Sequence, residues 1–179
     1  MDDDERNAYY STPLGRPDLE AVGAFWLRFL QTTGHNEPSD AGRPVPLGPP
    51  TPFCFGDSVE LADELIELVL HGLKRATAST IAELEAEGEA TPAVGDLSIV
   101  TDGSMRPRAL LETTDVRVGP LSSVDDQSAW DEGEGDRTRD WWLDAHTWSF
   151  TRSFQRLGLE FHPDIPVVFE RFIIRYQED

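Results

Sequence analysis

The chain has 179 residues, of which 39% are hydrophobic and 27% charged, a composition typical of one ordinary globular domain. Its 34 acidic and 15 basic side chains give a net charge of −19, which argues against an extended nucleic-acid duplex as a partner. The single cysteine, Cys54, excludes an internal disulfide and a cysteine-pair zinc site, and no apolar run approaches the roughly 20 residues that span a membrane.

The N-terminal third predicts three segments. Residues 1–17 are predicted to be a disordered or loosely attached tail, and their acidic start, MDDDERNAYY, lacks the basic and apolar parts of a signal peptide, so we expect a cytoplasmic protein. Residues 18–34 predict an accessory helix that Asp18 can cap and Gly34 can end. Residues 35–52 predict a proline-rich connection, because proline fixes φ and lacks an N–H.

Residues 53–179 are predicted to form the main domain. Ser58 or Asp57 can cap a helix that continues to about Leu70, where Gly72 allows the left-handed turn that closes a helix. The segment TIAELEAEG then predicts a short helix that ends at Gly88.

The second half of this domain has the pattern of strands and one long helix. VGDLSIVTDGSMRPRALLETTDVRVGP predicts a hairpin around Asp102 and Gly103, and IPVVFERFIIRY predicts a final strand. Between them, EGEGDRTRDWWLDAHTWSFTRSFQRLG begins as a loop and continues as a helix. The order predicts an α+β fold: a small, mostly antiparallel β-barrel flanked by helices, with an extra N-terminal helix.

The stretch HGLKRATAS places Lys74 and Arg75 beside Thr77 and Ser79, directly after a predicted helix end. One interpretation is structural: the cations complement the helix dipole, and the hydroxyls bond local backbone. The other is chemical. A threonine hydroxyl becomes a nucleophile once a base takes its proton, and a partly desolvated lysine of lowered pKa can be that base. In phosphate chemistry the same lysine can instead face developing negative charge as a cation.

A second group of candidates follows in the acidic segment DEGEGD and the helix after it. Glu132, Glu134 and Asp136 could form a solvated loop, supply a carboxylate that holds Lys74, or bind a divalent cation, but regular metal-loop spacing is absent, so we expect no cofactor. Trp142 could be a core residue or stack on a base. His146, one turn later, could be a buried hydrogen-bonded side chain or an acid or base in a cleft. His35 and His71 are predicted to be uninvolved.

Five segments, in order, resemble the ASCH domain family over about Phe53–Tyr176: FGDSVELADELIELVLHGLKRATAS, PAVGDLSIVTDG, ETTDV, EGEGDRTRDWWLDAH and PVVFERFIIRY. The resemblance implies a PUA-like fold, a compact β-barrel with helices around a cleft, and a link to RNA. Some members look like RNA-binding modules. Others are similar to ribonucleases, and a small subgroup is similar to amidohydrolases that remove an acyl group from the exocyclic amine of modified cytidine.

The resemblance also assigns roles to residues. The family's cleft motif, Gly-x-Lys followed closely by Thr or Ser, matches Gly72, Lys74, Thr77 and Ser79. In the amidohydrolase subgroup the lysine, a threonine three residues on and a later glutamate act together. We therefore expect Lys74, Thr77 and Glu134 as catalytic residues, with Glu132 as the competitor of Glu134. The expected ligand-binding residues are Gly72, Arg75, Ser79, Glu132, Arg137, Trp142 and His146.

Two functions remain open from the sequence. The first is a hydrolase that acts on RNA or on a modified nucleoside, and the second is a non-catalytic RNA- or nucleotide-binding module that uses the same cleft. The acidity of the chain favours a small nucleoside-derived ligand over a long polymer.

Overall fold

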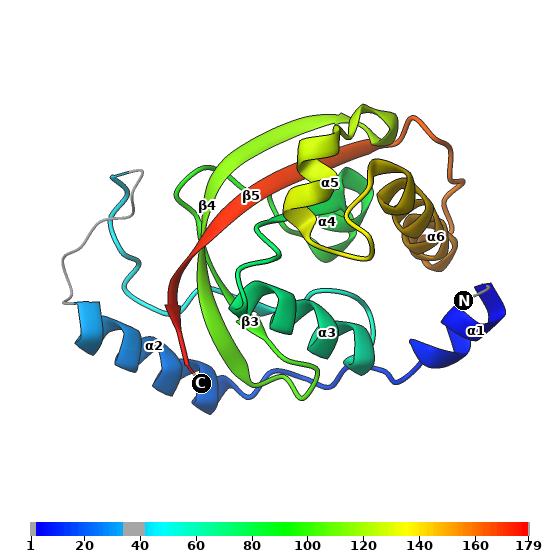
Figure 1. Ribbon diagram of the computed structural model, residues 1–179. Helices are drawn as coiled ribbons and strands as arrows, with labels where there is room; N and C mark the ends of the chain where they lie inside the picture. Colours follow the sequence, from blue (N-terminus) through cyan, green and yellow to red (C-terminus); the bar gives the residue numbers. More distant parts are fainter. Residues whose placement is uncertain (1–2, 34–41, 179) are drawn as a thin grey trace. The chain divides into compact units, whose positions relative to one another are not determined.

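The structure is a computed structural model that describes residues 3–33 and 42–178 (Figure 1). The elements, in chain order, are α1 (Asp3–Tyr9), α2 (Leu19–Thr33), β1 (Pro52–Phe53), α3 (Val59–Leu70), β2 (Ala76–Thr80), α4 (Ile81–Glu87), β3 (Leu97–Thr101), β4 (Pro107–Pro120), the 3₁₀ helix η1 (Leu121–Ser123), α5 (Asp126–Glu132), α6 (Arg139–Leu157) and β5 (Pro166–Gln177). Within the described residues, no helix is long and apolar enough to cross a membrane.

The strands form one sheet in the order β1-β3-β4-β5-β2. β1 pairs with β3 in parallel, whereas β3 pairs with β4 and β2 with β5 in antiparallel fashion. The α+β class is thus confirmed, but the expected closed barrel is not found: in the described part of the chain the sheet is open, with β1 and β2 at its edges. To close the sheet into a barrel, the two edge strands β1 and β2 would have to pair with each other. β1 has only two residues available for such pairing.

The chain divides into two compact units. Unit 1 comprises the described residues of Met1–His71, Gly95–Glu112 and Ile173–Asp179, and unit 2 comprises Gly72–Val94 and Thr113–Phe172. β4 and β5 therefore each contribute residues to both units.

In unit 1, the predicted N-terminal helix is present as α2, and it supplies most of a buried cluster. That cluster consists of Val22, Phe25, Trp26, Phe29, Ile99 and Leu110. A helix that buries its aromatic rings against β3 and β4 completes the core of its unit, because each buried large apolar side chain contributes about 1.5–3 kcal/mol. Gly34, His35 and the rest of 34–41 lie outside the described residues, so the predicted helix end and the first part of the connection stay predictions.

The segment before α2 has more contacts than a loose tail would have. Asp3–Tyr9 form α1, and the Thr12 carbonyl accepts a hydrogen bond from the Val59 amide at 3.0 Å. The Tyr10 hydroxyl donates to Glu64 at 2.9 Å, and the Thr12 hydroxyl donates to Glu60. Polar side chains of the segment thus bind acidic side chains of α3.

The predicted helix termini agree with the structure. The Ser58 side chain accepts from the Leu61 amide at the start of α3, and α4 ends at Gly88, whose φ of 73° is left-handed. The sequence did not predict a strand directly after α3, where Ala76–Thr80 form β2 and pair with β5. Strand pairing with a distant part of the chain sets its conformation, and local composition does not reveal such pairing.

Unit 2 has its own core, in which α4 and α5 each contact β2 and α6 (Figure 1). The buried cluster comprises Leu121, Val124, Ala129, Trp142, Phe150, Phe154, Ile165, Val167 and Phe169. α5 was not expected, because no sequence pattern predicted an element over residues 126–131 and a loop was predicted from Glu132 onward. This core positions β2, α5 and α6, the three elements that carry half of the candidate site residues.

Candidate functional site

Lys74 is the centre of a buried ion cluster in unit 2. Its side chain is 1% exposed, and its Nζ lies 3.0 Å from Glu132 Oε2 and 2.5 Å from Glu134 Oε1. Glu132 is equally buried, whereas the side chain of Glu134 is 14% exposed. The structure thus brings Lys74 together with both carboxylates that the sequence offered as alternatives.

Trp142 and His146 hold the far side of Glu132. Trp142 Nε1 donates to Glu132 Oε1 at 2.8 Å, and the His146 ring stacks on the Trp142 ring with centroids 3.8 Å apart. His146 Nδ1 lies 3.1 Å from the Trp142 carbonyl oxygen, which can only accept, so Nδ1 carries the proton. His146 Nε2 then lies 3.6 Å from Glu132 Oε2. Trp142 is therefore both a core residue and a partner of the ion cluster.

The charges in this cluster correct one chemical expectation. Burial alone would lower the pKa of Lys74, but the adjacent Glu132 and Glu134 carboxylates outweigh it and raise that pKa above its usual value. Burial would likewise raise the pKa of Glu132, but the Lys74 charge, aided by His146 and Trp142, holds it below its usual value. Lys74 is therefore charged at neutral pH in this arrangement, which favours a role as a cation over the expected role as a neutral base.

The glycines of EGEGD allow this close packing. Gly133 has φ of +76°, and a Cβ there would lie 2.4 Å from the Leu73 carbonyl oxygen. Gly135 has φ of +52°, and a Cβ there would lie 2.1 Å from the Trp141 ring. The two glycines therefore let the backbone on either side of Glu134 approach its neighbours, so the segment packs closely at Glu132 and Gly133, while Gly135 and Asp136 stay exposed.

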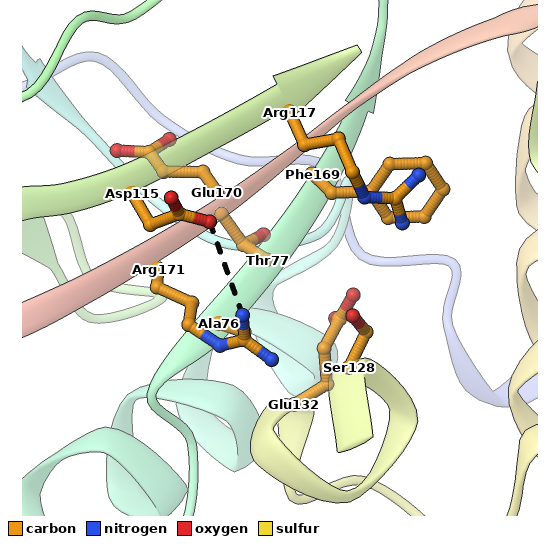
Figure 2. Close-up of a pocket in the computed structure, with 9 residues that line it drawn as sticks. All are labelled: Ala76, Thr77, Asp115, Arg117, Ser128, Glu132, Phe169, Glu170 and Arg171. Carbon is orange, nitrogen blue, oxygen red and sulfur yellow. Dashed lines mark ion pairs between the residues drawn. The ribbon is translucent and has the colours of Figure 1, made fainter. Parts of the chain in front are cut away.

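A small pocket lies beside the ion cluster, with a cavity volume of about 20 Å³. Figure 2 shows its lining: Ala76, Thr77, Asp115, Arg117, Ser128, Glu132, Phe169, Glu170 and Arg171. Thr77 and Glu132 thus both line the pocket, and Glu132 also binds Lys74, which is not part of the lining. This volume holds about one water molecule, so a larger ligand must lie partly outside it or displace side chains.

A second group of ionic contacts borders the pocket. Asp131 Oδ1 accepts from Arg75 at 2.9 Å, and its Oδ2 accepts from Arg171 Nε at 3.1 Å. The backbone adds a further bond, 2.7 Å long, from the Arg75 amide to the Asp131 carbonyl oxygen. This pairing ties the residue after Lys74 to the residue before Glu132. Arg75 itself is not part of the pocket lining.

The remaining expected residues have other surroundings. Gly72 has φ of +72° in the turn after α3, and Ser79 faces Val168 in the register of β2 and β5. The Arg137 guanidinium stacks 3.9 Å from the ring centre of Trp130 and donates to the Trp130 carbonyl oxygen. None of the three lines the pocket.

The suggested cation site at Glu132, Glu134 and Asp136 is not assembled. The first two carboxylates bind Lys74, whereas Asp136 accepts hydrogen bonds from the amide and hydroxyl of Thr138. Across residues 3–33 and 42–178, no group of three or more His, Cys, Asp or Glu side chains is arranged to hold a metal ion.

Sequence reasoning missed several residues that line or support the pocket: Asp115, Arg117, Ser128, Asp131, Phe169, Glu170 and Arg171. Most lie on strands β4 and β5. In a strand sequence, a charged residue is normally taken to face solvent. Only the pairing of β5 with β2, which sets Glu170 opposite Thr77, shows that they meet the HGLKRATAS segment.

Comparisons with known proteins agree with this geometry. A family model described as ASCH domain matches residues 51–176. The chain is similar to protein EF3133 from Enterococcus faecalis V583, with 30% identity, a TM-score of 0.75, and coverage of 87% of this chain and 88% of that one. It is also similar to an ASCH domain from Lactobacillus crispatus JV V101, with 27% identity, a TM-score of 0.75, and coverage of 94% and 99%. No curated protein matches the chain.

Proposed function

Because the chain belongs to the ASCH domain family, a PUA-like fold generally associated with RNA binding, we propose that it is a hydrolase acting on RNA or on a modified nucleoside. The observation that carries this proposal is the buried Lys74 ammonium, bound by two carboxylates beside a pocket that Thr77 and Glu132 line. Buried charges are costly, and perturbed ionisable groups that gather beside a pocket are typical of functional sites.

The proposed chemistry assigns the base role to a carboxylate. Glu134, the more exposed partner of Lys74, lies outside the pocket lining and takes the proton of the Thr77 hydroxyl through one water, while the Thr77 oxygen attacks the acyl carbon of the substrate. The Lys74 ammonium stabilises the negative charge that develops on the acyl oxygen. When the amine leaves, it receives the proton from Glu134, and water then hydrolyses the ester on Thr77. For RNA, the same ammonium faces the charge that develops at phosphorus.

The size and charge of the site favour a small substrate. A cavity of about 20 Å³ accepts only part of a ligand, and a chain of net charge −19 repels a polyanion at long range. An acylated nucleoside, of which only the acyl group must reach Thr77, fits these limits better than a long RNA.

One observation favours a second function, a non-catalytic RNA- or nucleotide-binding module. Both carboxylates bind Lys74, and they raise its pKa above the usual value because their charges outweigh the effect of burial. A fully paired lysine can serve to order Glu132 and the Gly133 turn without taking part in a reaction. This alternative predicts binding without turnover.

The experiment offers acylated cytidine and single-stranded RNA in parallel, with and without a divalent cation. We expect Glu134→Gln to lower kcat by at least about a hundredfold, the usual scale of general acid–base catalysis, with a much smaller change in KM. Thr77→Val should be equally damaging. The control is Glu160→Gln, which removes one exposed carboxylate elsewhere in unit 2.

Each outcome decides between the candidates. If wild-type protein binds one ligand but turns over neither, the hydrolase proposal fails and the binding module stands. If Glu132→Gln abolishes turnover while Glu134→Gln leaves it intact, the base is Glu132 instead.

A further inference from the structure

Arg117 of β4 is an unusual arginine for so acidic a chain. Of the 34 acidic side chains, none within the described residues forms an ion pair with it, although it lines the pocket beside Thr77 and Glu132. Most arginines of the described residues that bind neighbouring side chains bind carboxylates, as Arg75 and Arg171 do with Asp131. An unpaired guanidinium at a pocket retains its full charge for a ligand.

Arg117 is also held in one orientation. Its Cζ lies 4.0 Å from the ring centre of Phe169, and its terminal nitrogens donate to the hydroxyl and the carbonyl oxygen of Ser123 at 2.8 and 3.3 Å. Cation–π stacking and two hydrogen bonds fix the planar group while its Nε–H has no partner among the described residues. A cation fixed in advance loses little entropy when an anion binds.

Arg171 supplies a second set of donors to the same pocket. Only its Nε makes a hydrogen bond, to Asp131, while Nη1 lies 3.9 Å from Asp115, beyond hydrogen-bonding distance. Within the described part of the chain, its terminal nitrogens therefore have no hydrogen-bond acceptor. The Thr77 hydroxyl, likewise without a described partner, lies in the same lining (Figure 2).

Among the described residues no carboxylate forms an ion pair with Arg117, whereas Asp131 and Asp115 partly balance the charge of Arg171. Glu132 is bound by the Lys74 ammonium, and Glu170 accepts a hydrogen bond from the Thr113 hydroxyl. Asp115 is 60% exposed, so water screens its charge. Figure 2 shows Arg117 and Phe169 on the opposite side of the pocket from Asp115. An anionic group entering beside Arg117 therefore meets guanidinium and hydroxyl donors.

We infer that Arg117 and Arg171 form a phosphate-binding subsite, so that this pocket binds a nucleotide or a short oligonucleotide more tightly than the corresponding free nucleoside. The inference rests on the proposed function, whose ligand it narrows. Planar guanidinium groups with free N–H donors suit a phosphate, which accepts several charge-assisted hydrogen bonds. A terminal phosphate and an internal phosphodiester share this chemistry.

The test compares three probes by calorimetric titration at one low ionic strength: cytidine, cytidine 5′-monophosphate and the dinucleoside monophosphate of cytidine. We expect wild-type protein to bind at least one phosphate-bearing probe about tenfold or more tightly than cytidine, the effect expected of hydrogen bonds between charged groups. Arg117→Gln should remove this preference while the affinity for cytidine changes less than about twofold. The better phosphate probe identifies a terminal or an internal phosphate.

Two further variants keep the test decisive. Arg156→Gln removes a positive charge from the exposed last turn of α6 and should leave the preference intact. Arg171→Gln should weaken the preference for phosphate-bearing probes. This variant therefore tests the subsite independently if Arg117→Gln folds poorly. Equal affinity of wild-type protein for all three probes, or an Arg156→Gln effect as large as that of Arg117→Gln, would overturn the inference.

The two proposals can fail separately. If acylated cytidine is hydrolysed but a phosphate brings no gain in affinity, the hydrolase stands and the phosphate subsite is wrong. If the phosphate preference depends on Arg117 but no substrate is turned over, the subsite stands in a binding module. If the protein neither binds nor hydrolyses any probe, both are wrong.

Discussion

At the scale of single residues, the ion cluster around Lys74 decides what the site can do. Lys74 and Glu132 are each about as buried as the core leucines, and each would be costly without the other. Glu132 has three kinds of partner, namely the Lys74 ammonium, the Trp142 N–H and the nearby His146 ring. The cluster therefore stabilises the charged form of both members.

This charge state predicts how stability depends on pH. The raised pKa of Lys74 means that its contribution is present below the unfolded-state value of about 10.4 and is lost as the pH rises through the folded value. The lowered pKa of Glu132 means that its contribution is present above about pH 4.3 and is lost as the pH falls through its lower folded value. The pair should therefore stabilise the protein fully between these limits.

The measurement is urea unfolding of wild-type protein and Glu132→Gln at several pH values. The free energy of unfolding of the wild type, minus that of the variant, should be constant between about pH 5 and 9 and should decrease below about pH 4.3. Glu160→Gln, at an exposed position, should show a much smaller change over the same range. A difference that stays constant or grows on acidification would contradict the charge state described for Glu132.

The sequence could predict part of this cluster. The resemblance selected Lys74, and the two acidic candidates, Glu132 and Glu134, both meet it. It could not select Asp131, Arg117 or Arg171, because a charged residue in an α5 or strand sequence looks the same whether it faces solvent or a pocket. The sequence also could not predict whether the pKa of Lys74 is raised or lowered, because the direction of the shift depends on how many carboxylates lie within hydrogen-bonding distance of its ammonium group.

At the scale of elements, two helices end in the same way but in different surroundings. α4 ends at Gly88, with φ of 73°, and α5 ends at Gly133, with φ of 76°. A Cβ at Gly88 would meet nothing within 4 Å, whereas a Cβ at Gly133 would clash with the Leu73 carbonyl oxygen. The second glycine thus serves both the helix end and the approach of α5 to the backbone next to Lys74.

This pair of glycines gives a matched prediction. Gly88→Ala should cost about 1–2 kcal/mol of stability, the cost of a left-handed conformation for a residue with a Cβ. Gly133→Ala should cost more by at least about 1 kcal/mol, because the backbone of the turn must also move away from Leu73. Urea unfolding of both variants measures the two costs. Equal costs would show that the turn can relax without resistance.

The elements themselves were predictable where local signals agree. Ser58 and Gly88 mark helix ends by their own chemistry, and the structure has them there. α5 has no apolar stripe in its sequence DQSAWDE, and Trp130 of that helix is 50% exposed, so periodicity does not reveal it. Its hydrogen-bonding partners, Arg75 and Arg171, lie far along the chain.

At the scale of the whole molecule, the class of the fold followed from the order of its elements, but closure of the sheet did not. Strand order and edge pairing depend on long-range contacts that no short pattern encodes, and the described strands leave β1 and β2 as edges. The net charge, by contrast, is a property that the sequence states completely. The net charge directly affects the electrostatic interaction between the protein and a charged ligand.

The last prediction concerns the salt dependence of that encounter. Each phosphate of a single strand that the protein neutralises adds about 0.7 to the slope of log affinity against log salt. Since only Arg117 and Arg171 offer free guanidinium donors in the pocket, we expect a slope of magnitude about 0.7 to 1.4 for a short single-stranded RNA. Arg117→Gln should reduce it by up to about 0.7, and Arg156→Gln should leave it unchanged. Titrations between about 50 and 200 mM salt measure the slope. A slope several times steeper would show that a long RNA follows a basic track outside the pocket, and the small-ligand interpretation would then be wrong.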